Sequence, residues 1–267
     1  MSLSRVWAIV LRQLYLMKGS PSRLMPLFLW VAIDIVLWGF ISRFLNSVSH
    51  SGMDFVPTLL GAVLLWDFFA RVMQGVTIAF FEDIWSRNFL NLFCSPLSVP
   101  EYVAGLVVTS IATSLVGLLV MLLMSSAIFG LSFFSYGLAL IPFLLVLFVF
   151  GLALGIFACG IVLQLGPSAE WFIWPIPGML SPFAGVFYPL ATLPQWMQWI
   201  AHLLPPSYVF EGMRAVVAGG GIQTSELGIA TSLVLVYLLG ACWFFTTIYR
   251  RSVRSGRLAR YNAEGSS

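Results

Sequence analysis

The stretch AFFEDIWSRNFLNLFCSPLSVP, Ala79–Pro100, separates two long apolar runs and carries three charges within six positions. Those charges, Glu82, Asp83 and Arg87, stand out because only 9% of the chain is charged. A charged, amphipathic segment between apolar runs is typical of a loop that leaves a membrane and meets water. We therefore expect this stretch to be a water-exposed loop that contacts a soluble partner.

The composition indicates a membrane protein. The chain has 267 residues, and 60% of them are hydrophobic. A water-soluble domain of this size cannot bury so much apolar surface, so lipid must be the solvent for most of it. The length allows about six spanning helices of roughly 20 residues each. The sequence therefore predicts a single all-α membrane domain over residues 1–267 and excludes an isolated soluble domain.

Six apolar segments are long enough to cross a bilayer, and the basic residues orient them. Ten of the 13 Lys and Arg residues fall in segments that six crossings place on one side. By the positive-inside rule this side is cytoplasmic, so we expect both termini and residues 82–94 on the cytoplasmic face of the inner membrane. The predicted spans are residues 24–45, 55–80, 102–129, 134–163, 169–188 and 227–249.

The N-terminal segment, residues 1–20, has a helical pattern but is too short and too charged to cross a membrane. Arg5 and Arg12 are seven positions apart and share one helical face. This pattern is typical of an amphipathic helix that lies along the cytoplasmic membrane surface. A frayed N-terminal extension is the alternative interpretation.

Residues 193–218 contain two short helical stretches that Pro205 and Pro206 separate. We expect an external re-entrant hairpin here, between spans five and six, that dips into the outer leaflet. An amphipathic loop resting on the membrane is the alternative. Glu211 and Arg214 lie three positions apart in the second stretch. They either form a local salt bridge or, with the two prolines, line an external gate.

The sequence lacks the patterns that mark catalytic and metal sites. The single lysine, Lys18, is not part of a glycine-rich phosphate-binding loop, so this chain cannot hydrolyse ATP by that route. His50 and His202 are far apart without metal-ligand spacing, and the three cysteines are scattered. We expect no catalytic residue, no metal and no cofactor in this chain.

Three charged residues lie midway along predicted spans: Asp34 in the first, and Asp67 and Arg71 in the second. A charge at that depth costs about 2.5–3.5 kcal/mol on insertion scales, so each should face protein or water. Asp67 and Arg71 are four positions apart, hence on one helical face, and Asp34 could join them across the helix pair. The network is either structural or functional, as a polar patch on a conduit wall, a dimer contact or a proton relay.

Two stretches carry motifs of a known family. One is FEDIWSRNFLNLFCSPLSVPEYVAG, Phe81–Gly105, in which a charged helix precedes a Ser-Pro and the next span. The other is LSPFAGVFYPLATLPQWMQWIAHLLPPSYVFEGMRAVV, Leu180–Val217, with Phe-Tyr-Pro, Leu-Pro-x-Trp and Glu-x-x-Arg patterns. With these motifs the chain resembles the permease subunits of type 2 ABC exporters, the ABC-2 membrane family, over nearly its whole length.

The resemblance implies six spans per subunit, a homodimer or pseudo-dimer, and two copies of a separate nucleotide-binding ATPase subunit that binds ATP and Mg. It also implies that residues 82–94 form a coupling helix that fits a cleft on the ATPase. In that role, Glu82, Asp83 and Arg87 would anchor the helix, while Trp85, Phe89 and Leu92 would pack against the partner. The N-terminal helix would supply a second contact, and the external hairpin would close the outer mouth.

The aromatic content bears on the class of substrate. Aromatic residues make up 15% of the chain, which suits sugar rings but equally suits lipid contact. We expect an amphipathic, lipid, drug-like or glycan substrate, contact with membrane lipids, and no nucleic-acid partner. Two alternatives are a non-transporting membrane assembly subunit and a polytopic enzyme that acts on lipid-linked substrates through Asp34 or Asp67. Only the enzyme would be active alone, without ATP.

Overall fold

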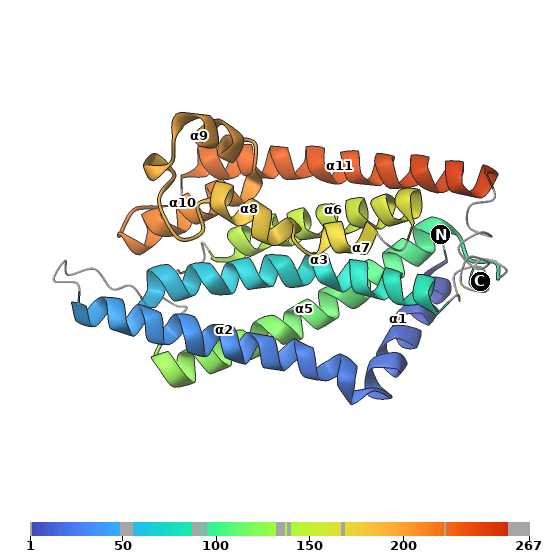
Figure 1. Ribbon diagram of the computed structural model, residues 1–267, viewed down its shortest axis with the longest axis horizontal. Coiled ribbons are helices and arrows are strands. Elements are labelled where there is room, and N and C mark those ends of the chain that lie inside the picture. Colours follow the sequence, from blue (N-terminus) through green and yellow to red (C-terminus); the bar gives the residue numbers. More distant parts are fainter. Residues whose placement is uncertain are drawn as a thin grey trace.

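The computed structural model describes residues 2–48, 56–86, 92, 95–131, 137, 140–166, 169–221 and 223–255. All regular structure within these ranges is helical, as the sequence predicts. The elements, labelled as in Figure 1, are α1 (Leu3–Lys18), α2 (Pro21–Val48), η1 (Val56–Leu60), α3 (Gly61–Trp85), α5 (Val99–Phe129), α6 (Leu140–Leu165), α7 (Glu170–Ile173), α8 (Ile176–Ala184), η4 (Leu190–Thr192), α9 (Gln195–His202), α10 (Pro205–Val217) and α11 (Thr224–Arg254).

The long helices run side by side along one axis (Figure 1). The helix α1 and the end of α11 lie at one end of this bundle, which we call the junction end. The short helices α9 and α10 lie at the opposite end, which we call the hairpin end. Each long helix therefore carries the chain from one end to the other.

Five stretches are long and apolar enough to cross a membrane, and they coincide with five of the six predicted spans. Their ends differ from the predicted ends by several residues, because a helix continues as long as its backbone hydrogen bonds are favourable, whether or not lipid surrounds it. The five stretches are Phe28–Val48, Val56–Trp85, Val99–Phe129, Leu140–Leu165 and Thr224–Ser252.

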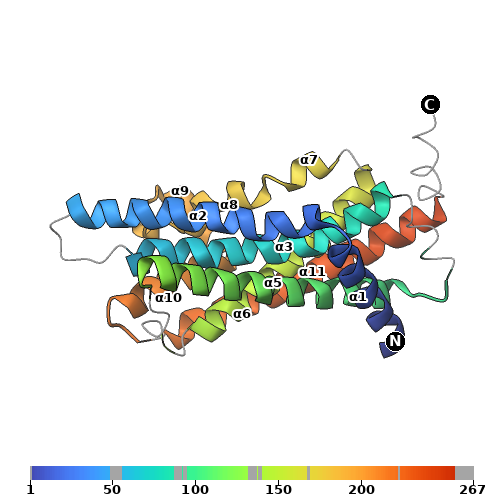
Figure 2. The ribbon, with the colours of Figure 1, turned by 90° about the horizontal axis from the view of Figure 1, so that it is seen from below.

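The remaining predicted span, residues 169–188, is not one continuous helix. The structure has the short helices α7 and α8 there, with a turn at Trp174 and Pro175 between them. A proline has no backbone N–H and its ring collides with the preceding turn, so Pro175 and Pro177 separate α7 from α8, whereas Pro182 lies inside α8. Figure 2 shows α7 and α8 following one another along the length of the bundle.

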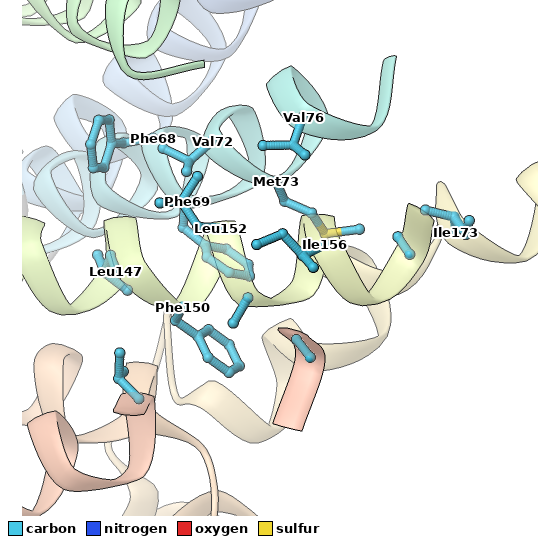
Figure 3. Packing of buried hydrophobic residues seen from close by; sticks show 14 of the residues in the cluster. Phe68, Phe69, Val72, Met73, Val76, Leu147, Phe150, Leu152, Ile156 and Ile173 are labelled. Carbon is cyan, nitrogen blue, oxygen red and sulfur yellow. The ribbon is translucent and has the colours of Figure 1, made fainter. Parts of the chain in front are cut away.

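The core lies between α3, α6 and α11. Figure 3 shows side chains of α3 and α6 meeting there, with Phe69 stacked on Phe150 at 5.4 Å between ring centroids. Gly151 and Gly155 of α6 face the α3 backbone: a Cβ at Gly151 would lie 2.9 Å from the carbonyl oxygen of Phe69. Small residues let membrane helices approach this closely, so the two glycines fix how α6 packs on α3.

The contact between α3 and α5 also depends on small residues. The hydroxyl of Ser110 in α5 donates a 3.0 Å hydrogen bond to the carbonyl oxygen of Val72 in α3. A Cβ at Gly75 would lie 2.6 Å from the same hydroxyl oxygen. The two helix backbones are therefore close enough for a side chain of one to bond the main chain of the other.

Candidate functional site

At the junction end, α1 packs directly on the first turns of α5. Gly105 makes this contact possible, because a Cβ at that position would lie 2.6 Å from the Cβ of Ile9. Ile9 and Val10 are buried by the contact. The N-terminal helix is therefore part of the packed bundle, and it crosses the ends of the long helices at an angle (Figure 2).

A buried carboxylate ties α1 to α3 and α5. Asp83, in the last turn of α3, accepts a 3.1 Å hydrogen bond at Oδ2 from Nη1 of Arg12, and its Oδ1 pairs with Nη2 of the same guanidinium. Tyr102 of α5 donates a 2.7 Å hydrogen bond to Oδ2 as well. The Asp83 side chain is 1% exposed, so the charge is compensated entirely within the fold.

Arg12 is the cationic member of this group. Burial lowers the pKa of its guanidinium, but the hydrogen bond and the charge of Asp83 outweigh burial, so that its pKa lies above the ordinary value. A guanidinium is charged at ordinary pH, and the pairing with Asp83 favours that charged form further. A bidentate guanidinium–carboxylate pair also fixes orientation, which holds α1 in one rotation against α3.

A second carboxylate holds the beginning of α1. Glu101, in the first turn of α5, accepts hydrogen bonds from the backbone N–H of Ser2 at 2.6 Å and of Ser98 at 2.9 Å. It also pairs with Arg5 at 3.4 Å. The bond from Ser98 is the return half of a capping box, so one side chain both caps α5 and tethers α1. We call Ser2, Arg12, Asp83, Glu101 and Tyr102 the α1 junction.

The junction changes how the amphipathic pattern of α1 is understood. Arg5 and Arg12 share a face, as predicted, and they pair there with Glu101 and Asp83. The outward face is instead largely apolar, although Ser4 and Lys18 are also exposed. Its exposed large hydrophobic side chains are Leu3, Trp7, Leu11, Leu14 and Tyr15.

Of the residues expected to couple the chain to an ATPase, some are buried, some are exposed, and two lie outside the described residues. Asp83 faces inward and not towards a partner, and Leu92 packs against the core. Trp85 ends α3 with 50% of its surface exposed and its ring 5.8 Å from that of Phe81. Glu82 belongs to the same last turn of α3. Arg87 and Phe89 lie outside the described residues.

The three charges predicted within spans are brought together where α2, α3 and α5 meet. The charges of Asp34, Asp67 and Arg71 act on one another. The Arg71 side chain crosses α5 at Gly117, where an added Cβ would lie 2.7 Å from Cδ of Arg71. A glycine therefore makes room for the long arginine stem within the bundle. Whether the network has a role in transport stays a hypothesis.

The predicted break at Pro205 and Pro206 is present at the hairpin end. Both prolines are buried in the first turn of α10, and α9 ends at His202 just before them. Proline suits a first helical turn, where the missing N–H would have no helical partner. The hydroxyl of Ser207 donates a 2.6 Å hydrogen bond to the carbonyl oxygen of Ala201, which closes the corner between the two helices.

Glu211 and Arg214 form the expected ion pair, with 3.0 Å between Oε1 and Nη2. Both also hold the turn that follows α8. Glu211 accepts a 2.6 Å hydrogen bond from the backbone N–H of Leu190, and Arg214 donates a 2.7 Å bond to the carbonyl oxygen of Gly185. Gly185 has a φ of 63°, a left-handed conformation that glycine adopts most easily. We call residues 185–190 the clamped turn.

Sequence reasoning missed the partners in the α1 junction. The pattern Ser98-x-x-Glu101 before an apolar run is a local signal for a capping box and could have drawn attention to Glu101. Arg12 and Asp83 are 71 positions apart, so no local pattern indicates their pairing. Among the described residues, no group of three or more His, Cys, Asp and Glu side chains could hold a metal ion.

Comparison with known proteins places the chain in a family. Residues 4–218 match the family model described as "ABC-2 type transporter", a match that runs from α1 to the end of α10. No curated protein matches the chain. Permease domains of this kind lack an ATPase site and generally pair with an ATPase subunit. With its helical fold and five membrane-spanning candidates, the chain is a multi-pass membrane permease and belongs to the ABC-2 type transporter family.

Proposed function

We propose that this permease is the membrane subunit of an ATP-driven exporter, and that its junction end faces the cytoplasm and the ATPase. The distribution of basic residues supports this orientation. Lys18 ends α1, and Arg250, Arg251 and Arg254 lie in the last turns of α11, all at the junction end. Basic residues of membrane proteins gather on the cytoplasmic side. Both termini are then cytoplasmic.

The observation that carries the proposal is the buried pairing of Arg12 with Asp83. Asp83 lies in the last turn of α3 and Glu101 in the first turn of α5, so the two carboxylates flank the connection that the resemblance assigns to ATPase contact. Because both bind α1, a force on that connection moves α1, α3 and α5 together. A transporter driven by a separate ATPase needs such a stiff contact, since the partner acts on it without a covalent link.

Within this proposal the coupling residues have two tasks. Trp85 is exposed at the end of α3 and packs on the ATPase, with Glu82 beside it and Arg87 and Phe89 continuing the contact. Asp83 and Leu92 support that surface from within. This division follows from exposure: a half-exposed tryptophan can bury a large apolar area on a partner, whereas the Asp83 carboxylate is 1% exposed and already paired inside the fold.

The hairpin end then faces outward. We propose that α7 and α8 together make the fifth of six crossings, broken by proline, and that α9 and α10 form the re-entrant hairpin. The helices α9 and α10 have 8 and 13 residues. At about 1.5 Å per residue they reach roughly 12 and 20 Å, too short for a bilayer core of about 30 Å. Pro205, Pro206, Glu211 and Arg214 would shape the external gate by fixing this hairpin.

The complete transporter, in this proposal, is a homodimer of the chain with two ATPase subunits that bind ATP and Mg. Exposed apolar side chains cover much of α2 and α11, which suits contact with lipid or with a second copy. The substrate class is amphipathic: a lipid, a drug-like molecule or a glycan that enters from the membrane. Such a substrate suits a permease whose outer surface is largely apolar.

The proposal is tested by purifying the chain from its native membrane in mild detergent and asking which soluble protein accompanies it. We expect a stoichiometric ATPase with a phosphate-binding loop. Trp85→Ala should weaken its binding, because this change removes exposed apolar area at the junction end. Trp199→Ala is the matched control, since Trp199 is 68% exposed at the hairpin end.

Loss of the ATPase from Trp85→Ala but not from Trp199→Ala would support the proposed coupling surface. Equal binding of the ATPase to both variants would place the coupling surface elsewhere. Absence of any ATPase in the purified wild-type complex would overturn the proposed function and favour a non-transporting assembly subunit.

A further inference from the structure

An aromatic stack connects α2 to the clamped turn. The indole of Trp38 lies parallel to the ring of Phe187, with 4.8 Å between centroids and 11° between planes. Trp38 belongs to the first long helix, and Phe187 lies within residues 185–190. Stacked rings at this distance attract each other beyond the effect of their buried area. The stack therefore joins two parts of the chain that are distant in sequence.

The clamped turn belongs to the hairpin end, because α10 holds it. Glu211 and Arg214 of α10 bond the main chain at Leu190 and Gly185, one at each end of the turn. Phe187 lies between these two bonds. A displacement of its ring is thus passed to α10 through two charge-assisted hydrogen bonds, which are stronger and shorter than neutral ones.

The other end of α2 is tied to the α1 junction. Only Gly19 and Ser20 separate the end of α1 from Pro21, where α2 begins. Arg12 and Asp83 hold α1 in place against α3. Trp38 lies about 26 Å along α2 from Pro21. Because a helix is stiff along its axis, a movement of the junction displaces Trp38 without a change in helix length.

Contacts next to Trp38 keep this part of α2 in register with α5. Gly39 lies directly against the ring of Phe129, where a larger residue would collide. Arg43 donates a 2.8 Å hydrogen bond to the carbonyl oxygen of Ile128 and lies over the Phe129 ring at 5.0 Å. These contacts therefore fix the position along the bundle at which Trp38 meets Phe187.

We propose that Trp38 and Phe187 are positioning residues that couple the α1 junction to the hairpin end, by way of α1, α2 and the clamped turn. The route is contiguous: its steps are the Arg12–Asp83 ion pair, the two-residue link between α1 and α2, the Trp38–Phe187 ring contact, and the two hydrogen bonds that join the clamped turn to α10. It runs through the first long helix and does not require movement within the tightly packed α3–α6 core. The inference rests on the proposed transport function.

The experiment measures whether ATP changes access to the hairpin end. Cys94→Ser, Cys159→Ala and Cys242→Ser remove the native thiols, and Leu193→Cys places one half-buried reporter just beyond the clamped turn. The complex with its ATPase is labelled with a water-soluble maleimide, without nucleotide and with ATP and vanadate. The ratio of the two labelling rates reports how strongly ATP acts on the hairpin end.

Trp38→Ala, Phe187→Ala and the double variant then form a double-mutant cycle. We expect each single change to reduce the ATP effect by about two- to tenfold, the range that the energy of one aromatic pair allows. The double variant should lose no more of the ATP effect than either single variant, because each single change already removes the same contact. The matched control is the pair Phe157 of α6 and Phe244 of α11, whose ring centroids are 4.9 Å apart. Alanine there should leave the ATP effect unchanged.

Each outcome decides one point. If the wild-type complex responds to ATP and the Trp38 and Phe187 variants respond equally well, the route through α2 is wrong while the transport function stands. The route is also wrong if the double variant loses as much of the ATP effect as the two single variants lose together. If the wild-type complex shows no ATP response at all, both the route and the proposed function fail.

Discussion

Tyr102 donates a 2.7 Å hydrogen bond to Oδ2 of Asp83, the oxygen that Arg12 also reaches. Tyr102 is completely buried. The phenol thus fixes the carboxylate from the α5 side while the guanidinium fixes it from the α1 side. Three helices share one negative charge, and the stability of the junction end should depend on that charge.

Asp83→Ala should destabilise the protein by about 3 kcal/mol, because Arg12 would lose its partner while remaining largely buried. Removing one member of a buried ion pair costs about 3–5 kcal/mol, and Arg12 keeps 26% side-chain exposure, which favours the lower value. Tyr102→Phe removes one hydrogen bond to a charged group and should cost about 1.5–3 kcal/mol. Equilibrium unfolding in mixed micelles measures both free energies.

The combined variant Arg12→Leu with Asp83→Leu is the control for this prediction. It removes both charges and should recover part of the stability that either single change loses. Recovery would show that the loss comes from an uncompensated charge. A double variant less stable than Asp83→Ala would mean that shape and not charge dominates the junction.

Arg71→Ala should be more damaging than Asp67→Asn. Without Arg71, the negative charges of Asp34 and Asp67 repel each other with no positive charge to offset them, which we expect to cost about 3 kcal/mol. Asp67→Asn leaves one negative and one positive charge and should cost less. Expression in membranes and unfolding in micelles compare the two variants.

Arg43→Ala is the matched control, because Arg43 also lies in a spanning helix but bonds the carbonyl oxygen of Ile128 at an exposed position. We expect a loss of about 1 kcal/mol from it. If Arg71→Ala costs no more than Arg43→Ala, the buried network is not structural, and a role on the conduit wall or in a dimer contact gains support.

Gly151→Ala should destabilise the α3–α6 contact by about 1–3 kcal/mol, since its new methyl group would lie 2.9 Å from the backbone oxygen of Phe69. A backbone atom cannot rotate away as a flexible side chain can. Gly240→Ala in α11 is the control, because nothing lies within 4 Å of a Cβ there. It should stabilise the helix by up to about 1 kcal/mol, and opposite signs in the two unfolding measurements would confirm the packing.

Glu211→Ala should loosen the clamped turn without unfolding the protein. The N–H of Leu190 loses its acceptor and Arg214 loses its counter-ion, an effect of about 1.5–3 kcal/mol on local opening. Amide hydrogen exchange over residues 185–192 should then be at least about tenfold faster. Glu226→Ala, in the first turn of α11, should leave exchange in this segment unchanged. If residues 185–192 exchanged at the same rate in both variants, Glu211 would not hold the clamped turn.

Local patterns predicted much of the fold. Long apolar runs gave five helices at the expected places, and the breaks at Pro205 and Pro206 lie where expected. The predicted span over residues 169–188 is formed by two short helices, because Pro175 and Pro177 lack the backbone N–H groups that would continue α7 into α8. At the site, Glu211 and Arg214 pair as their spacing of three indicates, but their bonds to the clamped turn could not be predicted.

The sequence by itself determined the lipid solvent, the approximate positions of five long helices and the break at Pro205 and Pro206, because each depends on residues that are neighbours along the chain. Only the tertiary structure decided that Asp83 faces Arg12 and Tyr102, that Arg71 lies over Gly117, and that Trp38 meets Phe187. These contacts depend on how helices rotate and pack against one another. Helix periodicity specifies one face of each helix, but the partner of that face is set by the shape of the whole bundle.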